Sequence, residues 1–193
     1  DGPQPTGLRY CMNSVALDDV SVGFDATQHL LNLGHTKIGM VTGPLAEDCS
    51  QDRCEGFKYA LATKDLTTQP AFTIEGDWSA KSGYDALMAF AELGNMPSAI
   101  VAQNDLMAVG MLRAARDMGI AIPDQLSIIG IDDIPMASYS APPLTTIKQD
   151  FLMIGQEAAK LLIRAVEEPK APLQHLVLPA EMVIRRSTGP YKA

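Results

Sequence analysis

Basic residues are scarce in this sequence. Its 193 residues include 15 Lys and Arg but 23 Asp and Glu, which gives a formal net charge of −8. Proteins bind nucleic acid mainly through clustered Lys and Arg side chains that neutralise phosphates. The composition therefore argues against a phosphate-binding surface on this chain, and any contact with DNA would need residues outside it.

Cysteine and histidine are also rare. The three cysteines, Cys11, Cys49 and Cys54, are too few and odd in number for a disulfide framework, which favours a reducing compartment, the cytoplasm. The cysteines and the three histidines show no metal-ligand spacing, so we expect no metal site. The sequence also lacks the Walker A, GxGxxG and GxSxG motifs. We therefore predict no cofactor.

Long apolar runs are absent as well. No stretch approaches the ~18 apolar residues that span a membrane, and residues 1–5 contain no signal-peptide core. We expect a soluble chain without a membrane partner, whose hydrophobic content of 47% can bury a core in one domain or two small ones. Because Asp1 rather than Met stands first, we expect a fragment or a processed product.

Short apolar runs alternate with amphipathic stretches. Runs typical of buried strands begin near residues 37, 71, 98 and 126, and a helical pattern follows each of the first three. This alternation, at a period of ~30 residues, predicts right-handed βαβ units. We therefore predict an α/β fold with a doubly wound parallel sheet and helices on both faces. Further expected elements are helices over 19–33 and 151–165 and strands at 14–17, 175–178 and 182–184.

Small residues and prolines mark where these elements begin and end. Ser79 is expected to cap a helix at its start, and Gly119 to end one as a C-terminal cap. Pro142 and Pro143 exclude a helix from their surroundings. We therefore interpret residues 135–150 as a crossing segment that serves as a hinge or linker.

Polar residues collect where the predicted strands end. At that edge of a parallel sheet, α/β proteins bind their ligands. Carboxylates, an amide and a guanidinium can hydrogen-bond the hydroxyls of a sugar, while an aromatic ring stacks on its apolar face. We interpret this set as a carbohydrate site. In chain order it comprises Arg53, Asp77, Trp78, Asn104, Asp105, Asp132 and Asp133.

Members of this set also have structural explanations. One of Asn104 and Asp105 can cap the helix that follows, while the other faces the crevice. Because Asp is a favoured helix cap, we expect capping rather than ligand contact for Asp105. Asp133 is equally well explained as a solvated acid in a loop, and Trp78 alone as core or surface filler. We interpret Cys49 and Cys54 as ordinary small residues rather than nucleophiles.

Several runs, in order along the chain, resemble the regulatory core of the lactose-repressor (LacI/GalR) family. The resemblance covers nearly the whole chain, from about Ser14 to Thr188. Residues 75–80 and 142–151 are most similar to the lactose-repressor branch of the family. The runs that carry the resemblance are HLLNLGH (29–35), GP (43–44), Arg53 with GF (56–57), NDLMAVG (104–110), GIDD (130–133) and PPLTTIKQD (142–150).

The resemblance implies the periplasmic-binding-protein-like (type I) core of a transcriptional regulator, a repressor, and not an enzyme. In such a core a small effector binds between two subdomains, and closure of the cleft changes how a homodimer presents its headpieces to operator DNA. A small sugar, first of all a galactoside, is the expected effector, with purines and other sugars as alternatives. The matching positions give Arg53, Asn104 and Asp132 as hydrogen-bond partners of sugar hydroxyls, Trp78 as the ring that packs on the sugar, and Gln149 and Phe151 as residues that line the cleft.

The resemblance also implies one complete and one partial subdomain. Residues 1–18 and 149–180 correspond to part of the first subdomain. Residues 19–148, with the final strand and tail at 181–193, correspond to the complete second one.

The partial subdomain has two expected consequences. Its helix should expose apolar side chains, for example Ile154, Leu161 and Leu162. Because one wall of the cleft is incomplete, we expect weak sugar binding by these residues alone. The headpiece that contacts operator DNA lies outside them.

Two other function classes share this architecture. A sugar-binding protein of a transport system has the same fold, but the unpaired cysteines and the crossing segment argue against it. A small-molecule enzyme could use Asp132 and Asp133 as acid and base, but no base stands beside a plausible nucleophile. The ordered motifs, and not the fold alone, favour the regulator.

Overall fold

The chain forms two compact units. The computed structural model describes residues 13–192. Unit 1 contains the described residues up to Asp18 together with Gln149–Ala180, and unit 2 contains Asp19–Lys148 and the residues from Glu181 onward. The chain therefore crosses from one unit to the other three times.

Unit 2 is built on a six-stranded sheet with the order β3-β2-β4-β5-β6-β8. Neighbouring strands are parallel except for β6 and β8, which are antiparallel. Every residue of β2 and β4 is buried, as expected for central parallel strands covered on both faces. The strands are β2 (Ile38–Thr42), β3 (Thr73–Glu75), β4 (Ala99–Ala102), β5 (Ser127–Asp132), β6 (Thr145–Lys148) and β8 (Glu181–Val183).

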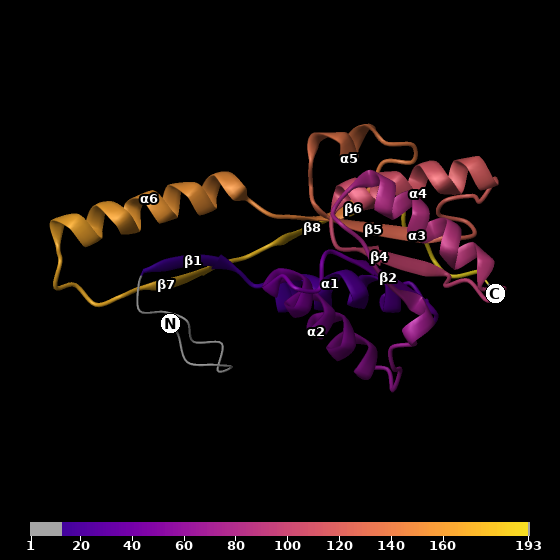
Figure 1. Cartoon of the computed structure of the whole chain (residues 1–193), viewed down its shortest axis with the longest axis horizontal. Coiled ribbons are helices and arrows are strands. Elements are labelled where there is room, and N and C mark those ends of the chain that lie inside the picture. Colours follow the sequence, from indigo (N-terminus) through magenta and orange to yellow (C-terminus); the bar gives the residue numbers. More distant parts are fainter. Residues whose placement is uncertain (1–12, 193) are drawn as a thin grey trace. The chain divides into compact units, whose positions relative to one another are not determined.

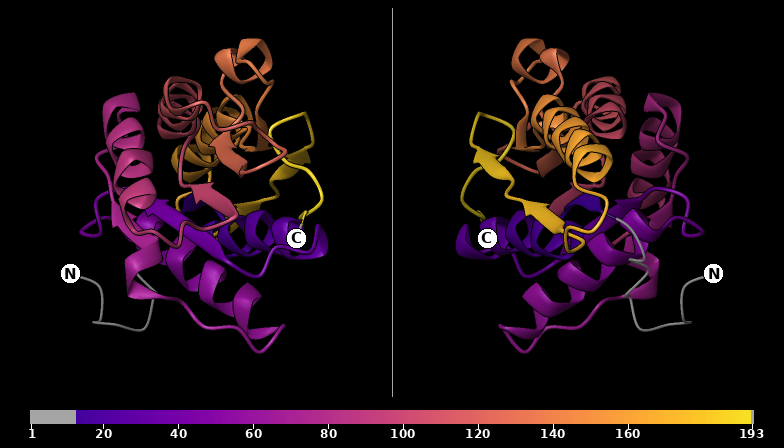
Figure 2. Two further views of the ribbon diagram at one scale, coloured as in Figure 1. Left: turned by 90° about the vertical axis from the view of Figure 1, so that its right-hand side faces the viewer. Right: turned by 90° about the vertical axis from the view of Figure 1, so that its left-hand side faces the viewer.

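Helices cover both faces of this sheet. The pair α1 and α2 lies on one face and the pair α3 and α4 on the other (Figures 1 and 2). The α/β fold predicted from the sequence, with its doubly wound sheet, is therefore confirmed. The helices are α1 (Asp19–Asn32), α2 (Asp48–Ala62), α3 (Ala80–Glu92) and α4 (Asp105–Met118).

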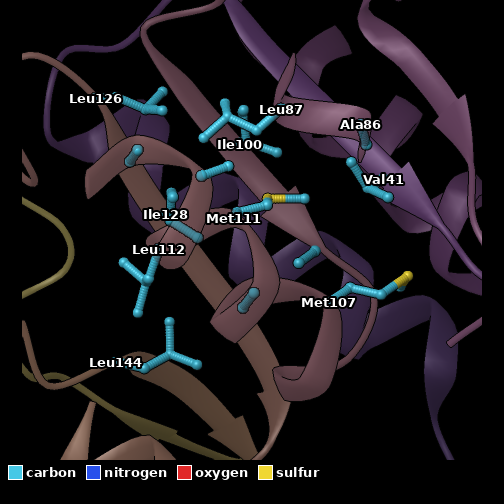
Figure 3. Close-up of a cluster of buried hydrophobic side chains, with 14 of the residues drawn as sticks. Val41, Ala86, Leu87, Ile100, Met107, Met111, Leu112, Leu126, Ile128 and Leu144 are labelled. Carbon is cyan, nitrogen blue, oxygen red and sulfur yellow. The ribbon is translucent and has the colours of Figure 1, made fainter. Parts of the chain in front are cut away.

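The main core of unit 2 lies between the sheet and the pair α3 and α4 (Figure 3). Met107 and Met111 of α4 and Leu87 of α3 contact strand residues such as Ile100 and Ile128, and all five side chains are fully buried. Burial of a large apolar side chain contributes about 1.5–3 kcal/mol to folding. This core therefore fixes α3 and α4 on the strands whose ends carry the polar residues discussed below.

The expected caps are present. The hydroxyl of Ser79 accepts a hydrogen bond from the N–H of Ser82 at 3.1 Å and begins α3. Gly119 ends α4 in the left-handed conformation, with φ of 71°. Side-chain capping and a glycine at the end of a helix satisfy backbone groups that the helix leaves unpaired.

The interpretation of residues 135–150 as a hinge is wrong for most of the segment. It contains the short helix α5 (Pro135–Tyr139) and β6, a fifth parallel strand that pairs with β5. The prolines come before β6 and so leave its hydrogen bonds intact. The hydroxyls of Thr145 and Thr146 are buried but hydrogen-bonded, so these polar residues can occupy a central strand.

The described residues of unit 1 form three elements. Strands β1 (Ser14–Leu17) and β7 (His175–Leu178) are parallel, and helix α6 (Phe151–Glu167) packs against β1. A largely apolar groove of about 360 Å³ lies between β1 and α6. Leu161 is buried, but Leu162 is 67% exposed. The expected exposure of the apolar face of α6 therefore holds for Leu162 but not for Leu161.

No helix among residues 13–192 combines the length and the apolar content needed to cross a lipid bilayer.

Candidate functional site

Four of the predicted site residues lie together at the carboxyl-terminal edge of the sheet in unit 2. The Asn104 side chain donates a hydrogen bond from Nδ2 to the carbonyl of Trp78 at 2.9 Å. The guanidinium carbon of Arg53 lies 5.9 Å from the centre of the Trp78 ring. The charge of Arg53 also acts on the Asp132 carboxyl group at the end of β5. Residues that follow four different strands therefore share one rim.

Arg53 is held rigidly in the first half of α2. Its Nε donates to Asp19 Oδ1 at 2.7 Å, and its Nη1 donates to the carbonyl of Gln103 at 2.5 Å. Only 7% of its side chain is exposed. Sequence reasoning treated Asp19 only as the start of a helix, and it missed that this acid orients and partly neutralises Arg53.

Asn104, not Asp105, caps α4. The backbone of Asn104 is extended, and its Oδ1 accepts a hydrogen bond from the N–H of Met107 at 2.9 Å. Asp105 is the first helical residue, and its carboxylate accepts hydrogen bonds from Ile134 and Thr146 instead. The prediction that Asp105 acts as the cap is therefore wrong.

Asp105 instead joins α4 to the loops that follow β5 and to β6. It is fully buried, and it accepts hydrogen bonds from the Thr146 hydroxyl at 2.6 Å and the Ile134 N–H at 2.9 Å. Burial raises its pKa to about 7, although both hydrogen bonds favour the charged form. A Cβ at Gly130 would lie 2.1 Å from Asp105 Oδ1, so this side chain needs a glycine beside it.

Asp132, the last residue of β5, and Asp133, which follows it, have different surroundings. Asp132 makes no side-chain hydrogen bond within residues 13–192, and burial raises its pKa to about 6 against the opposing effect of Arg53. Asp133 forms an ion pair with Arg185 at 2.6 Å, and both side chains are largely buried. Its interpretation as a solvated loop acid is therefore wrong, because Arg185 compensates its charge. Asp132 remains as an acceptor without a donor.

Trp78 stands at the end of the loop after β3 and is partly buried. Its indole Nε1 lies 3.2 Å from both carboxylate oxygens of Glu47. The ring covers Gly43, where a Cβ would lie 2.0 Å from the ring atom Cζ2. Neither contact was foreseen from the sequence, because the loops that make them are far apart along the chain.

Asp77, the neighbour of Trp78, has a local role. Its carboxylate accepts hydrogen bonds from the N–H and the hydroxyl of Ser79, and the hydroxyl lowers the pKa of Asp77 to about 2. It therefore shapes the turn that leads into α3.

Gln149 and Phe151, the other two predicted site residues, belong to unit 1. Gln149 is buried, and Phe151 is 58% exposed at the first position of α6, which Asp150 caps. The six predicted residues are therefore divided between the two units.

The cysteines and histidines among residues 13–192 do not form a reactive site. Burial raises the pKa of both Cys49 and Cys54, which disfavours a thiolate, and Cys11 lies outside the described residues. Burial also lowers the pKa of His35, whose ring nitrogens lie within hydrogen-bond distance of Ser98 and Ser127 at the starts of β4 and β5. Among residues 13–192, no group of His, Cys, Asp and Glu side chains could hold a metal ion.

Comparison with known proteins places this geometry in a family. Residues 27–188 match the periplasmic binding protein-like domain. The chain belongs to this family. Two relatives are the HTH-type transcriptional repressor PurR of Haemophilus influenzae (strain PittEE), 34% identical over 91% of this chain and 54% of its own length, and the HTH-type transcriptional regulator DegA of Bacillus subtilis, 37% identical over 93% and 53%.

A solved member of the LacI family supports the same assignment. The structure of a LacI family transcriptional regulator from Enterococcus faecium, with bound ribose, has a TM-score of 0.84 and 34% identity, and the match covers 93% of this chain and 66% of that one. The chain spans about half the length of the curated relatives named above.

The family resemblance seen in the sequence is thus confirmed at the level of the periplasmic-binding-protein-like domain of LacI-family regulators. The finer likeness to the lactose-repressor branch is not supported, because these relatives are PurR and DegA. That likeness rested on residues 75–80 and 142–151, which form the turn and cap before α3 and the strand β6.

Proposed function

We propose that this chain is the effector-binding core of a LacI-type transcriptional repressor and that it recognises a small neutral sugar at the rim of unit 2. The observation that carries the proposal is the convergence of Arg53, Trp78, Asn104 and Asp132 on that rim. Gln149 and Phe151 of unit 1 are the two further ligand contacts that we propose.

The chemistry of the rim suits a ligand with several hydroxyls. Asp132 offers a carboxylate acceptor, and the second N–H of the Asn104 amide and the guanidinium of Arg53 offer donors. The Trp78 ring offers an apolar face for the carbon skeleton of a sugar. These four residues do not include a nucleophile hydrogen-bonded to a base, which is the arrangement that covalent catalysis uses.

The charge of the rim favours neutral ligands. Asp19 already compensates Arg53 at 2.7 Å, so the Asp132 carboxylate leaves an excess of negative charge. A phosphorylated or carboxylated ligand would meet repulsion there, and burial makes this repulsion stronger than in water. A galactoside is the first candidate. A purine base is the second, because a relative at 34% identity is named PurR.

The regulatory part of the proposal concerns the whole protein. In a cytoplasmic homodimer of the whole protein, effector binding would change the affinity for operator DNA, which is contacted through a headpiece outside these residues. A sugar-binding protein of a transport system is the alternative. In a longer protein that carries the headpiece, a bound effector should change retention of operator DNA in a gel-shift assay, whereas a transport protein should retain none.

Calorimetric titration tests the ligand. Methyl β-galactoside, ribose, guanine and galactose 6-phosphate should be compared on the wild type and on Asp132→Asn. We expect weak but saturable binding of a neutral compound, little binding of the phosphate ester, and about tenfold weaker binding by Asp132→Asn. Asp117→Asn, which changes an exposed acid of α4, is the matched control and should bind as the wild type does. Binding of the phosphate ester alone, or of no compound, would contradict the proposal.

A further inference from the structure

Trp78 is held from three sides. Its carbonyl accepts a hydrogen bond from Asn104 at 2.9 Å, and its ring lies against Gly43. Its indole N–H points at the carboxylate of Glu47, with both oxygens at 3.2 Å. Trp78 is therefore held at its backbone carbonyl, at the face of its ring and at its indole N–H.

The backbone of Trp78 shows that this arrangement is imposed by its surroundings. Its φ is 68°, in the left-handed region that bulky side chains rarely adopt. Such a conformation persists only where neighbouring contacts determine it, and it is often found at ligand sites. The contacts around Trp78 here are the hydrogen bonds with Asn104 and Glu47 and the packing of the ring on Gly43.

Glu47 occupies a position where a helix-capping side chain would be expected. It is the residue before α2 and has the extended backbone of a helix cap, but its side chain makes no capping hydrogen bond. Instead the carboxylate reaches a residue 31 positions further along the chain. A second carboxylate ties the same two loops together, because Glu75 accepts a hydrogen bond from the N–H of Leu45 at 2.8 Å.

We infer that Glu47 is a positioning residue that sets the orientation of the Trp78 ring and thereby the ligand affinity of the rim. The predicted effect on ligand affinity rests on the proposed function. The contact between Glu47 and Trp78 does not. Without Glu47, the ring keeps its contact with Gly43 but loses the only hydrogen bond described for its indole N–H. The ring can then rotate away from Arg53, which lies 5.9 Å from its centre.

The size of the effect follows from the exposure of Glu47. The residue is exposed, so its hydrogen bond competes with water and contributes modestly. We expect about fivefold weaker ligand binding for Glu47→Ala. The Glu47→Gln variant keeps an oxygen acceptor and should restore most of the affinity.

Fluorescence of the 193-residue chain tests the contact directly, because Trp78 is its one tryptophan. Glu47→Ala should shift the emission to longer wavelength and increase quenching by acrylamide, and Glu47→Gln should lie between it and the wild type. Glu55→Ala changes an exposed acid within α2, one that accepts a hydrogen bond from Tyr59, and should match the wild type. Thermal unfolding of all variants shows whether the fold is kept. Emission and quenching of Glu47→Ala equal to those of Glu55→Ala would overturn the inference.

Titration with the neutral compound that binds the wild type tests the consequence. Weaker binding by Glu47→Ala with recovery in Glu47→Gln supports the inference, and equal binding by all variants overturns it. If the wild type binds none of the panel, the proposed function fails, while the fluorescence comparison still decides whether Glu47 positions Trp78.

Discussion

Asp105 and Asp132 are two acids of the same rim that differ in the hydrogen-bond donors around their carboxylates. Asp105 is fully buried and has two donors, the Thr146 hydroxyl and the Ile134 N–H. Asp132 is less buried and has no donor within the described part of the chain. In both residues burial raises the pKa, to about 7 and about 6. The first is therefore built into the fold, and the second is available to a ligand.

The pH dependence of stability should report on Asp105. Its pKa is higher in the folded chain than in the unfolded chain, so the folded state holds the proton more tightly. The contribution of Asp105 to the free energy of unfolding should therefore be largest below about pH 4 and fall as the pH rises through about 7. In Asp105→Asn the amide oxygen can accept from Ile134 and the amide N–H can donate to Thr146, without any charge to bury. Between pH 5 and pH 8 this variant should lose on the order of 2 kcal/mol less stability than the wild type.

Urea unfolding at the two pH values measures this difference. Asp132 titrates over part of the same range, so some dependence should remain in Asp105→Asn. Glu92→Gln, an exposed position on α3, should keep the wild-type dependence. An Asp105→Asn variant with the full wild-type slope would show that Asp105 stays ionised in the fold.

At the residue scale, the sequence predicts which residues stand at the rim, but not which residues position the rim side chains. Arg53, Asn104 and Asp132 could be found because each follows a predicted strand, and parallel strands bring their ends together. Asp19 and Glu47 could not, because their partners lie 34 and 31 positions away. Local patterns do not encode which loop a long side chain will reach.

At the scale of elements, Asn104 links helix α4 to the rim of unit 2. Its Oδ1 caps α4 by accepting from Met107, and its Nδ2 fixes the carbonyl of Trp78. Asn104→Ser separates these two roles, because a serine hydroxyl can cap a helix about as well as asparagine but is too short to reach Trp78. We expect its free energy of unfolding to stay within about 1 kcal/mol of the wild type, with about tenfold weaker ligand binding.

Asn104→Ala is the comparison, since it loses both contacts. Its free energy of unfolding should fall by about 1–2 kcal/mol below that of the serine variant, in urea titrations at neutral pH. Equal stability of the two variants would mean that the cap contributes little. Undiminished ligand binding by Asn104→Ser would mean that the Trp78 tether does not matter for the rim.

Element boundaries were predictable where a local signal marks them. Ser79 and Gly119 stand where the sequence predicts a cap, because capping is a property of a few adjacent residues. Strand β6 was missed because its residues are mostly polar and follow two prolines. Its buried threonines are acceptable only because partners from distant segments, Asp105 and Thr188, satisfy their hydroxyls.

At the scale of the whole molecule, the three crossings between the units make unit 2 discontinuous in the sequence. Its last strand, β8, joins the sheet only after the chain has passed through unit 1. Strands β6 and β8 are antiparallel, and Lys148 stands opposite Glu181 at the end of the pair. That geometry is the one that a two-residue hairpin closes.

Unit 2 should therefore fold alone when Lys148 is joined to Glu181 by Asn-Gly and residues 1–18 and 149–180 are removed. Every contact described for Trp78 comes from unit 2, so the shortened chain should unfold cooperatively in urea and keep the wild-type tryptophan emission. It should bind the effector more weakly than the 193-residue chain, because it lacks Gln149 and Phe151. A shifted emission or a gradual unfolding curve would show that unit 1 supports the rim, and unchanged affinity would show that Gln149 and Phe151 do not contact the ligand.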